Sequence, residues 1–319
     1  MAELRTLSFP SSDGIHTIQG QEWLPVGQPK AVVQIVHGVA EHIGRYDRTA
    51  RFLCDHGYLV CGADHLGHGR TAQQDGSLGY FAPRDGWKLV TDDVRRLRLL
   101  QGEKYPGIPY FMLGHSMGSF LTRTYLCRFP GEISGAVLSG TGQEPAIATA
   151  LGGLIARCIR RSKGDHYISP LIHSLSLGSY NRKFKPNRTS SDWISRDEAA
   201  VDAYLSDPLC SFQPSVGMFI DMLDGLRYIA SPKSLKRMDP DTPVYFFSGE
   251  QDPVGGMGKQ VKKVYGWFYA HGVKDLSLKL YPGGRHEMFN ELNRQQVLDD
   301  LLQWLDRHQS RAKCSFSLK

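Results

Sequence analysis

The chain has 319 residues, of which 41% are hydrophobic, 10% aromatic and 22% charged. This composition excludes an intrinsically disordered protein and supplies enough apolar side chains for a large core. The net charge of +6 is too small for the strongly basic surface of a nucleic-acid-binding protein, so no nucleic acid is expected as a partner. The longest apolar stretch (residues 146–159) is interrupted by Arg157, and no membrane-spanning segment is expected.

The first predicted elements are strands. Residues 4–9 and 16–23, separated by a Ser-Ser-Asp-Gly turn, predict an antiparallel pair. Residues 31–36 and 58–64 are continuous apolar runs, which are typical of parallel strands buried on both faces. The intervening residues 50–57 predict a helix.

Strands and helices continue to alternate along the chain. In residues 87–97, apolar side chains recur at helical spacing opposite charged ones, which predicts an amphipathic helix packed on a sheet. Short connections between strands and helices favour a mostly parallel sheet with helices on both faces. The further predicted strands are 109–114, 133–140, 243–249 and 276–282, and the further helices are 119–129, 259–271 and 297–305.

Residues 141–240 interrupt this alternation. They are rich in Ser, Pro and Arg, contain no buried-strand pattern, and include two helical segments at 146–161 and 215–230. A hundred residues between two strands are too many for a loop. We therefore predict an inserted helical cap at 141–240 and an α/β core formed by 1–140 and 241–319.

The positive charge is concentrated in this predicted cap. Residues 151–190 contain eight Arg or Lys residues and one acidic residue, so the rest of the chain is nearly neutral. The first helical segment of the cap is apolar and then basic, which allows two interpretations. We expect its apolar face to pack on the core. The alternative is transient contact with a membrane surface.

Cysteine usage and the N-terminal residues indicate the cellular compartment. Residues 1–14 lack the apolar segment of a signal peptide, and no Cys-x-x-Cys pair occurs. Scattered cysteines without a secretion signal are typical of reduced thiols, which predicts a cytoplasmic protein with peripheral membrane contact as an option. The six cysteines are Cys54, Cys61, Cys127, Cys158, Cys210 and Cys314.

The most specific motif is Gly-His-Ser-Met-Gly at residues 114–118, between a predicted strand and a predicted helix. Gly-x-Ser-x-Gly in that context is a nucleophile elbow, in which the tight turn leaves no room for side chains at the two glycines. The turn would expose the hydroxyl of Ser116 above the sheet. The backbone N–H of Met117, and that of Val39 after the third predicted strand, would stabilise an oxyanion.

A serine hydroxyl needs a base to become a nucleophile. In this type of fold the expected chain order is Ser, then Asp or Glu, then His. His286 follows the last predicted strand and Asp252 follows the strand at 243–249, so both are expected at the carboxyl edge of the sheet. We predict that His286 accepts the proton of Ser116 and that Asp252 orients His286, with Glu250 as the competing acid.

A metal or cofactor is not expected. His65 and His68 have a spacing that could suit a metal ion, but no acidic, Cys or His partners complete a set of ligands. A polar loop is the simpler interpretation of these two histidines. The predicted reaction of a serine nucleophile needs no cofactor.

Five segments together resemble a known family. They are HGVAEHIGRY (37–46), ADHLGHGRT (63–71), LGHSMGS (113–119), SGEQDPV (248–254) and GGRHEMFNE (283–291). This set is similar to the monoacylglycerol lipase and lysophospholipase branch of the α/β-hydrolases. The resemblance covers the predicted core and is weak across the predicted cap. It implies an α/β-hydrolase fold, with a mostly parallel eight-stranded sheet, flanking helices and a cap.

The resemblance also implies roles for particular residues. It assigns Ser116, Asp252 and His286 as the catalytic triad, and Val39 and Met117 as the oxyanion donors. It further implies that Glu41 and Arg45 order the polar end of the substrate pocket. Two positions depart from the animal lipases: Ala40 replaces a glycine, and Phe289 replaces a second histidine near the glycerol site.

Three functions from different classes remain open. The leading expectation is a serine hydrolase that cleaves small-molecule, single-chain acyl esters of the monoacylglycerol or lysophospholipid type through an acyl-enzyme. An aminopeptidase of the same fold would need carboxylates that hold the substrate amine. The third is a ligand-binding or receptor protein that has kept the fold. The intact triad argues against it. The candidate carboxylates in the predicted cap are Asp192, Asp197, Glu198 and Asp202.

Overall fold

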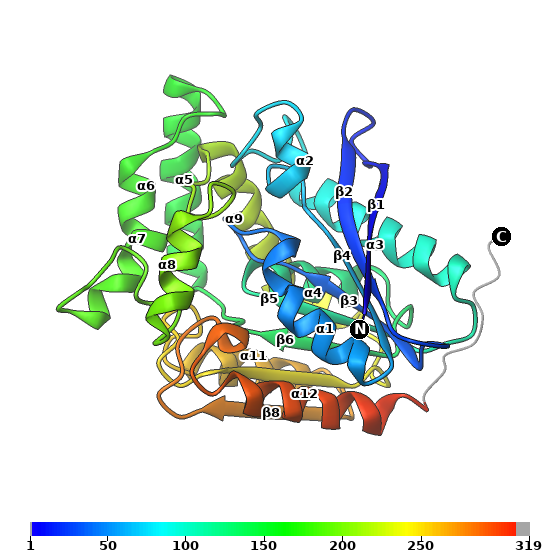
Figure 1. Ribbon diagram of the computed structural model, residues 1–319. Coiled ribbons are helices and arrows are strands. Elements are labelled where there is room, and N and C mark those ends of the chain that lie inside the picture. The colour runs from blue at the N-terminus through cyan, green and yellow to red at the C-terminus, as the bar shows by residue number, and fades with distance from the viewer. Residues whose placement is uncertain (1, 311–319) are drawn as a thin grey trace.

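A computed structural model describes residues 2–310 and contains one eight-stranded sheet flanked by helices (Figure 1). The strand order across the sheet is β1-β2-β4-β3-β5-β6-β7-β8. The bounds are β1 Glu3–Pro10, β2 Thr17–Leu24, β3 Ala31–Val36, β4 Tyr58–Ala63, β5 Tyr110–His115, β6 Gly135–Ser139, β7 Val244–Gly249 and β8 Leu276–Tyr281.

The pairing of the strands confirms the predicted antiparallel start and the parallel remainder. Strand β2 pairs antiparallel with both β1 and β4, and all pairs from β4 and β3 through to β8 are parallel. Every residue of β3 to β7 is buried. Burial on both faces explains why these strands are continuous apolar runs rather than alternating patterns.

Helices cover both faces of the sheet. Alternate strand residues point to opposite faces, so Val32 and Val36 join one core cluster while Val33 and Ile35 join the other. The first cluster includes residues of α3, α4 and α11, and the second includes residues of α1 and α12. The bounds are η1 Ile43–Tyr46, α1 Asp47–Asp55, α2 Gly69–Gln73, α3 Gly86–Lys104, α4 Met117–Arg128, α11 Lys259–Ala270, η3 Met288–Asn290 and α12 Arg294–His308.

The chain between β6 and β7, which we call the β6–β7 segment (residues 140–243), forms helices and no strand. Helices α5 to α8 lie together to one side of the sheet, in green in Figure 1. Helix α9 connects this segment to the main core, since its apolar residues join the cluster that α4 packs against. The bounds are α5 Ala146–Lys163, α6 Pro170–Leu175, α7 Leu177–Tyr180, η2 Asn181–Phe184, α8 Glu198–Ser206, α9 Val216–Ala230 and α10 Pro232–Leu235.

Helix α5 corrects one expectation. Its buried residues are the small ones, Thr149, Gly153 and Ala156, whereas Ile147 and Leu151 are 82% and 56% exposed. The expected packing of the apolar face therefore holds for the small residues and for Ile159, which packs beside Ala156 against α9 residues, but not for Ile147, Leu151 and Leu154. Small residues let α5 approach α9 closely, while Ile147, Leu151 and Leu154 lie on the exposed face of α5.

No helix within residues 2–310 has both the length and the apolar character needed to cross a bilayer. The cysteines that lie in this range are free thiols, and four of the five are buried. Cys314 lies outside the described residues.

Candidate active site

The turn between β5 and α4 places Ser116 in a backbone conformation that few residues adopt, with φ of 53° and ψ of −122°. A Cβ atom at Gly114 would lie 2.4 Å from the carbonyl oxygen of Gly118, and one at Gly118 would lie 1.8 Å from that of Val36. These contacts confirm the predicted steric need for both glycines. The N–H of Ser116 donates to the carbonyl of Ser139 at 2.9 Å, which holds the strained residue in place.

The loops after β7 and β8 bring Asp252 and His286 together. His286 Nδ1 lies 3.0 Å from Asp252 Oδ1, and both side chains are buried. Asp252 also accepts hydrogen bonds from Ser248 Oγ at 2.8 Å and from the N–H of Val254 at 2.9 Å. When Nδ1 donates to a carboxylate, the other ring nitrogen, Nε2, is left as a proton acceptor. The competing acid, Glu250, is exposed.

The pair has shifted pKa values that suit a base and its orienting acid. Burial alone would raise the pKa of Asp252, but the nearby His286 and the three hydrogen bonds lower it below its usual value. Burial alone would lower the pKa of His286, but the charge and hydrogen bond of Asp252 raise it. Asp252 is thus held ionised, and His286 becomes a better proton acceptor.

A cavity of about 240 Å³ contains both Ser116 and His286 in its wall, together with Val39 and Glu41. Met117, the first residue of α4, is fully buried beside Ser116. The structure therefore brings the nucleophile candidate, the base candidate and the loop of Val39 to one cavity. The donation of the Val39 and Met117 N–H groups to an oxyanion stays a prediction.

The loop after β3 passes close to the elbow because of Gly38. A Cβ atom at this position would lie 3.0 Å from the Cβ of Ser116 and 2.7 Å from Oε1 of Glu41. The N–H of Gly38 donates to Glu41 Oε1 at 2.5 Å, which fixes the start of the loop. Ala40 has a φ of 58°, a left-handed conformation that favours the glycine found at this position in the animal lipases.

A buried ionic network lies behind this loop. The Arg45 guanidinium donates to Glu41 at 2.9 Å and to both carboxylate oxygens of Glu287 at 2.7 Å. Glu41 also accepts from Tyr46 Oη at 2.8 Å, and Glu287 from Asn290 Nδ2 at 2.9 Å. Glu41 and Glu287 are among the residues that line the cavity, and Arg45 lies behind them.

The two carboxyl groups of this network titrate differently. Burial alone would raise the pKa of Glu287, but the charge and hydrogen bonds of Arg45 lower it to about 2. Burial raises the pKa of Glu41 above its usual value, against the opposing effect of Arg45. Glu287 was not predicted as a site residue. The only sequence signal was its place next to His286, because its partner Arg45 lies 242 positions away in the chain.

Comparison with known proteins identifies the family. The family model described as serine aminopeptidase, S33, matches residues 27–293, which is most of the chain. The chain belongs to this family. The monoacylglycerol lipase of Mycolicibacterium smegmatis is 31% identical, over 94% of this chain and 96% of the relative. The human monoglyceride lipase is 29% identical, over 91% of this chain and 87% of the relative.

Solved structures agree with this family. A carboxyl esterase from Bacillus coagulans, in complex with glycerol, superposes with a TM-score of 0.90 at 28% identity, over 97% of this chain and 99% of that one. A soluble variant of the Saccharomyces cerevisiae monoglyceride lipase, bound to a substrate analogue, gives 0.71 at 25% identity, over 97% of both chains. The predicted α/β-hydrolase fold is confirmed, and the chain is an esterase or lipase of the monoglyceride lipase group.

Other polar groups of this S33 hydrolase lie near the cavity without facing it. His37, His65 and His68 are buried with their rings 4.0 to 6.0 Å apart. Burial lowers the pKa of His65 to about 3 and that of His68 to about 4, so both rings are neutral. His65 bonds to the backbone of His37, and His68 to that of Leu66, as expected for a polar loop.

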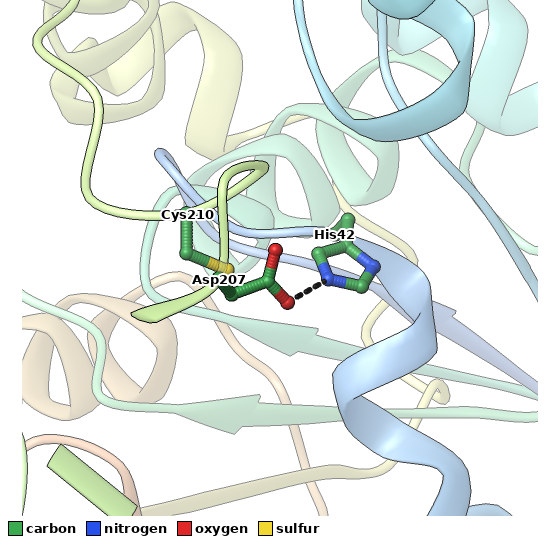
Figure 2. A group of neighbouring side chains, drawn as sticks. All are labelled: His42, Asp207 and Cys210. Atoms are coloured by element: carbon green, nitrogen blue, oxygen red, sulfur yellow. Dashed lines mark hydrogen bonds and ion pairs between the residues drawn. The ribbon is translucent and has the colours of Figure 1, made fainter. Parts of the chain in front are cut away.

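His42, Asp207 and Cys210 form a mixed group between the loop after β3 and the β6–β7 segment (Figure 2). His42 Nε2 lies 2.9 Å from Asp207 Oδ2, and the three donor atoms lie within 4.8 Å of one another. However, the N–H of Gly44 donates to His42 Nδ1 at 3.2 Å, which places the proton of the neutral ring on Nε2. The arrangement therefore suits a hydrogen bond from His42 to Asp207 better than a metal ion.

Proposed function

We propose that this hydrolase cleaves carboxylic esters of a single acyl chain through an acyl-enzyme, with Ser116 as nucleophile, His286 as base and Asp252 as the acid that orients it. The observation that carries the proposal is the shared cavity. The strained elbow of Ser116 and the buried Asp252–His286 pair, formed by loops far apart in the chain, meet at the same 240 Å³ space.

The proposed reaction has two steps. His286 Nε2 accepts the proton of Ser116 as Oγ attacks the ester carbonyl, and the N–H groups of Val39 and Met117 stabilise the oxyanion. His286 then donates this proton to the leaving alcohol as the ester bond breaks. In the second step water loses a proton to His286 and attacks the acyl-enzyme, and the acid leaves as Ser116 regains its proton. The proton of Ser116 leaves with the alcohol and a proton from water replaces it, so His286 is the only acid or base that the reaction needs.

The proposed substrates are of the monoacylglycerol or lysophospholipid type. The monoacylglycerol type follows the names of the relatives, and the lysophospholipid type follows the family resemblance of the sequence motifs. The polar wall formed by Glu41 and Glu287 agrees with both, because their carboxylates can accept hydrogen bonds from an alcohol. Phe289 packs against Phe247 in the core, with ring centroids 5.4 Å apart, so it offers no polar atom to a glycerol group.

We further propose that the β6–β7 segment is the cap predicted at residues 141–240 and that it contacts membranes transiently. Ile147, Leu151 and Leu154 on α5 are at least 56% exposed, and Leu171 and Leu175 on α6 are 52% and 63% exposed. We call these five residues the α5–α6 apolar surface. It is continuous with the basic end of α5, the combination typical of helices that lie on anionic membranes.

Flotation with anionic phospholipid vesicles tests the membrane contact. The double variant Leu151→Ser/Leu154→Ser and the variant Arg161→Ser/Lys163→Ser should each float less than the unaltered protein. Leu292→Ser removes an equally exposed leucine outside the surface (62% exposed) and should float normally. Equal flotation of all four proteins would remove this part of the proposal.

The peptidase alternative finds little support in the predicted cap acids. Asp197 pairs with Arg294 at 2.8 Å and Asp202 with Arg188 at 2.7 Å, while Asp192 accepts hydrogen bonds from Thr189. Within residues 2–310, none of these side chains, nor that of Glu198, lines the cavity. They stabilise the β6–β7 segment rather than a substrate amine.

An ester panel tests the proposed function. We expect hydrolysis of p-nitrophenyl esters and monoacylglycerols but not of aminoacyl amides, and a loss of about 10³-fold or more in Ser116→Ala. Ser174→Ala is the matched control and should retain full activity, because the Ser174 hydroxyl is half-buried and bonds to a backbone carbonyl of its own helix, α6. Undiminished hydrolysis by Ser116→Ala would refute the mechanism, and a preference for aminoacyl amides would favour the peptidase. Absence of hydrolysis with retained ligand binding would favour the receptor.

A further inference from the structure

Two aromatic rings from different parts of the chain pack against the imidazole of His286. The ring of His115, next to Ser116, has its centroid 4.7 Å away with an interplanar angle of 45°. The indole of Trp193, from the β6–β7 segment, has its centroid 5.0 Å away with an angle of 35°. Trp193 also lines the cavity and packs against Tyr180. The segment above the site therefore contributes an aromatic face directly to the candidate base.

The residues that follow Trp193 are anchored to the loop that carries His286. The N–H of Glu287 donates to the carbonyl of Ile194 at 2.7 Å, and Ser195 Oγ donates to the carbonyl of Asn290 at 2.9 Å. Arg196 adds an ion pair at 2.9 Å to Glu291, whose side chain is fully buried. These bonds fix the position of Trp193 relative to His286, so the ring contact is a built feature of the fold.

The charges around His286 come from several elements. Asp252 follows β7, Glu287 is its neighbour in the chain, and Glu41 and Arg45 belong to the network behind the loop after β3. His115 contributes no charge near neutral pH, because burial lowers its pKa to about 3. When His286 accepts the proton of Ser116, the new positive charge lies within about 6 Å of the indole centroid, the range of a cation–π interaction.

We propose that Trp193 is a positioning residue whose indole face stabilises the imidazolium form of His286 and so raises the basicity of the catalytic histidine. This inference rests on the proposed function of His286. Tryptophan has the strongest cation–π attraction of the aromatic side chains, and the attraction increases where water is excluded. Because it acts on the charged form of His286 only, it stabilises the transition state more than the resting enzyme.

Fluorination of the indole tests the electrostatic role without changing the shape of the side chain. Mono-, di- and trifluorotryptophan are introduced at position 193, and the pH dependence of kcat/KM is measured with a water-soluble ester. The base must be neutral to act, so its pKa sets the acidic limb of the profile. We expect the midpoint of this limb to move to lower pH in steps, by about 0.5 to 1 pH unit over the series, and kcat on the plateau to fall by about threefold to tenfold.

Trp267 provides the control for fluorination at Trp193. The same analogues at Trp267, on α11, should leave the profile unchanged. A purely structural Trp193 would give profiles with an unmoved acidic limb, which would overturn the proposal. If the substituted enzymes are too slow to measure, an NMR titration of His286 in the Ser116→Ala background gives the same comparison. Failure of the proposed function would appear separately, as hydrolysis that survives Ser116→Ala.

Discussion

Replacement of Glu287 by glutamine tests how much the buried ionic network contributes to the free energy of unfolding, and how this contribution changes with pH. The side chains of Arg45 and Glu287 are 11% and 7% exposed, so solvent screens their attraction little. Arg45 lowers the pKa of Glu287 from 4.5 to about 2 against the opposing effect of burial. At about 1.4 kcal/mol per pH unit, this shift corresponds to about 3 kcal/mol of folding free energy.

The sign of the effect follows from the lowered pKa. The ionised carboxylate stabilises the folded protein fully above the unfolded-state value of 4.5, and this stabilisation is lost as the pH falls through about 2. The contribution of Glu41 to stability changes with pH in the opposite direction. Because burial raises the pKa of Glu41, its protonation in the folded state offsets part of the stability that Glu287 loses at low pH. Glu287→Gln should therefore be destabilised by about 3 kcal/mol at pH 7, and its deficit should shrink steadily below pH 4.5.

Urea unfolding followed by tryptophan fluorescence at pH 7, 5, 4 and 3 gives the comparison. Asp241→Asn breaks an exposed pair, in which Lys274 and Asp241 are 70% and 64% exposed, and should leave the free energy of unfolding at pH 7 almost unchanged. A deficit of Glu287→Gln that stays constant from pH 7 to pH 3 would refute the reasoning, because uncharged packing losses do not titrate.

Three further predictions concern the proposed triad acid, the elbow and the loop after β3. Asp252→Asn should lower kcat by about 10³ to 10⁴-fold with little change in KM, and should move the acidic limb of the pH–rate profile to lower pH, because Asp252 raises the pKa of His286. Gly118→Ala should fail to fold or lose activity, as judged by solubility and ester hydrolysis, since its Cβ would lie 1.8 Å from a backbone oxygen; Gly266→Ala, with open space around it, is the control. Ala40→Gly should raise the thermal midpoint of unfolding, because it relieves up to about 1 kcal/mol of backbone strain at a φ of 58°. A lowered midpoint would show that the entropy of glycine outweighs that strain.

The core of the fold was predictable because its signals are local. Strands β3 to β7 are buried along their whole length, so each appears in the sequence as an unbroken apolar run. The elbow was equally readable, because a tight strand-to-helix turn requires Gly114 and Gly118 at fixed spacing from Ser116. The order of acid and histidine then indicated Asp252 and His286, and the structure places these two in contact.

The features that sequence reasoning missed depend on distant partners. The exposure of Ile147, Leu151 and Leu154 on α5 follows from the small residues of its other face, which contact α9 about seventy positions later in the sequence. Glu287 gains its role from Arg45, 242 positions away, and Trp193 reaches His286 only because the β6–β7 segment folds back over the site. No periodicity or motif within a single segment records such pairings.

The position of Arg45 changes how the polar end of the site would meet a substrate. The family resemblance implies that Glu41 and Arg45 order this end of the pocket, but in this chain the guanidinium also engages both oxygens of Glu287. Glu41 in turn accepts from the N–H of Gly38, so the planar Arg45 side chain joins the loop after β3 to the loop of His286. Because the two carboxylates and not Arg45 line the cavity, the leaving alcohol of the proposed reaction meets acceptors, which favours alcohols that carry free hydroxyl groups.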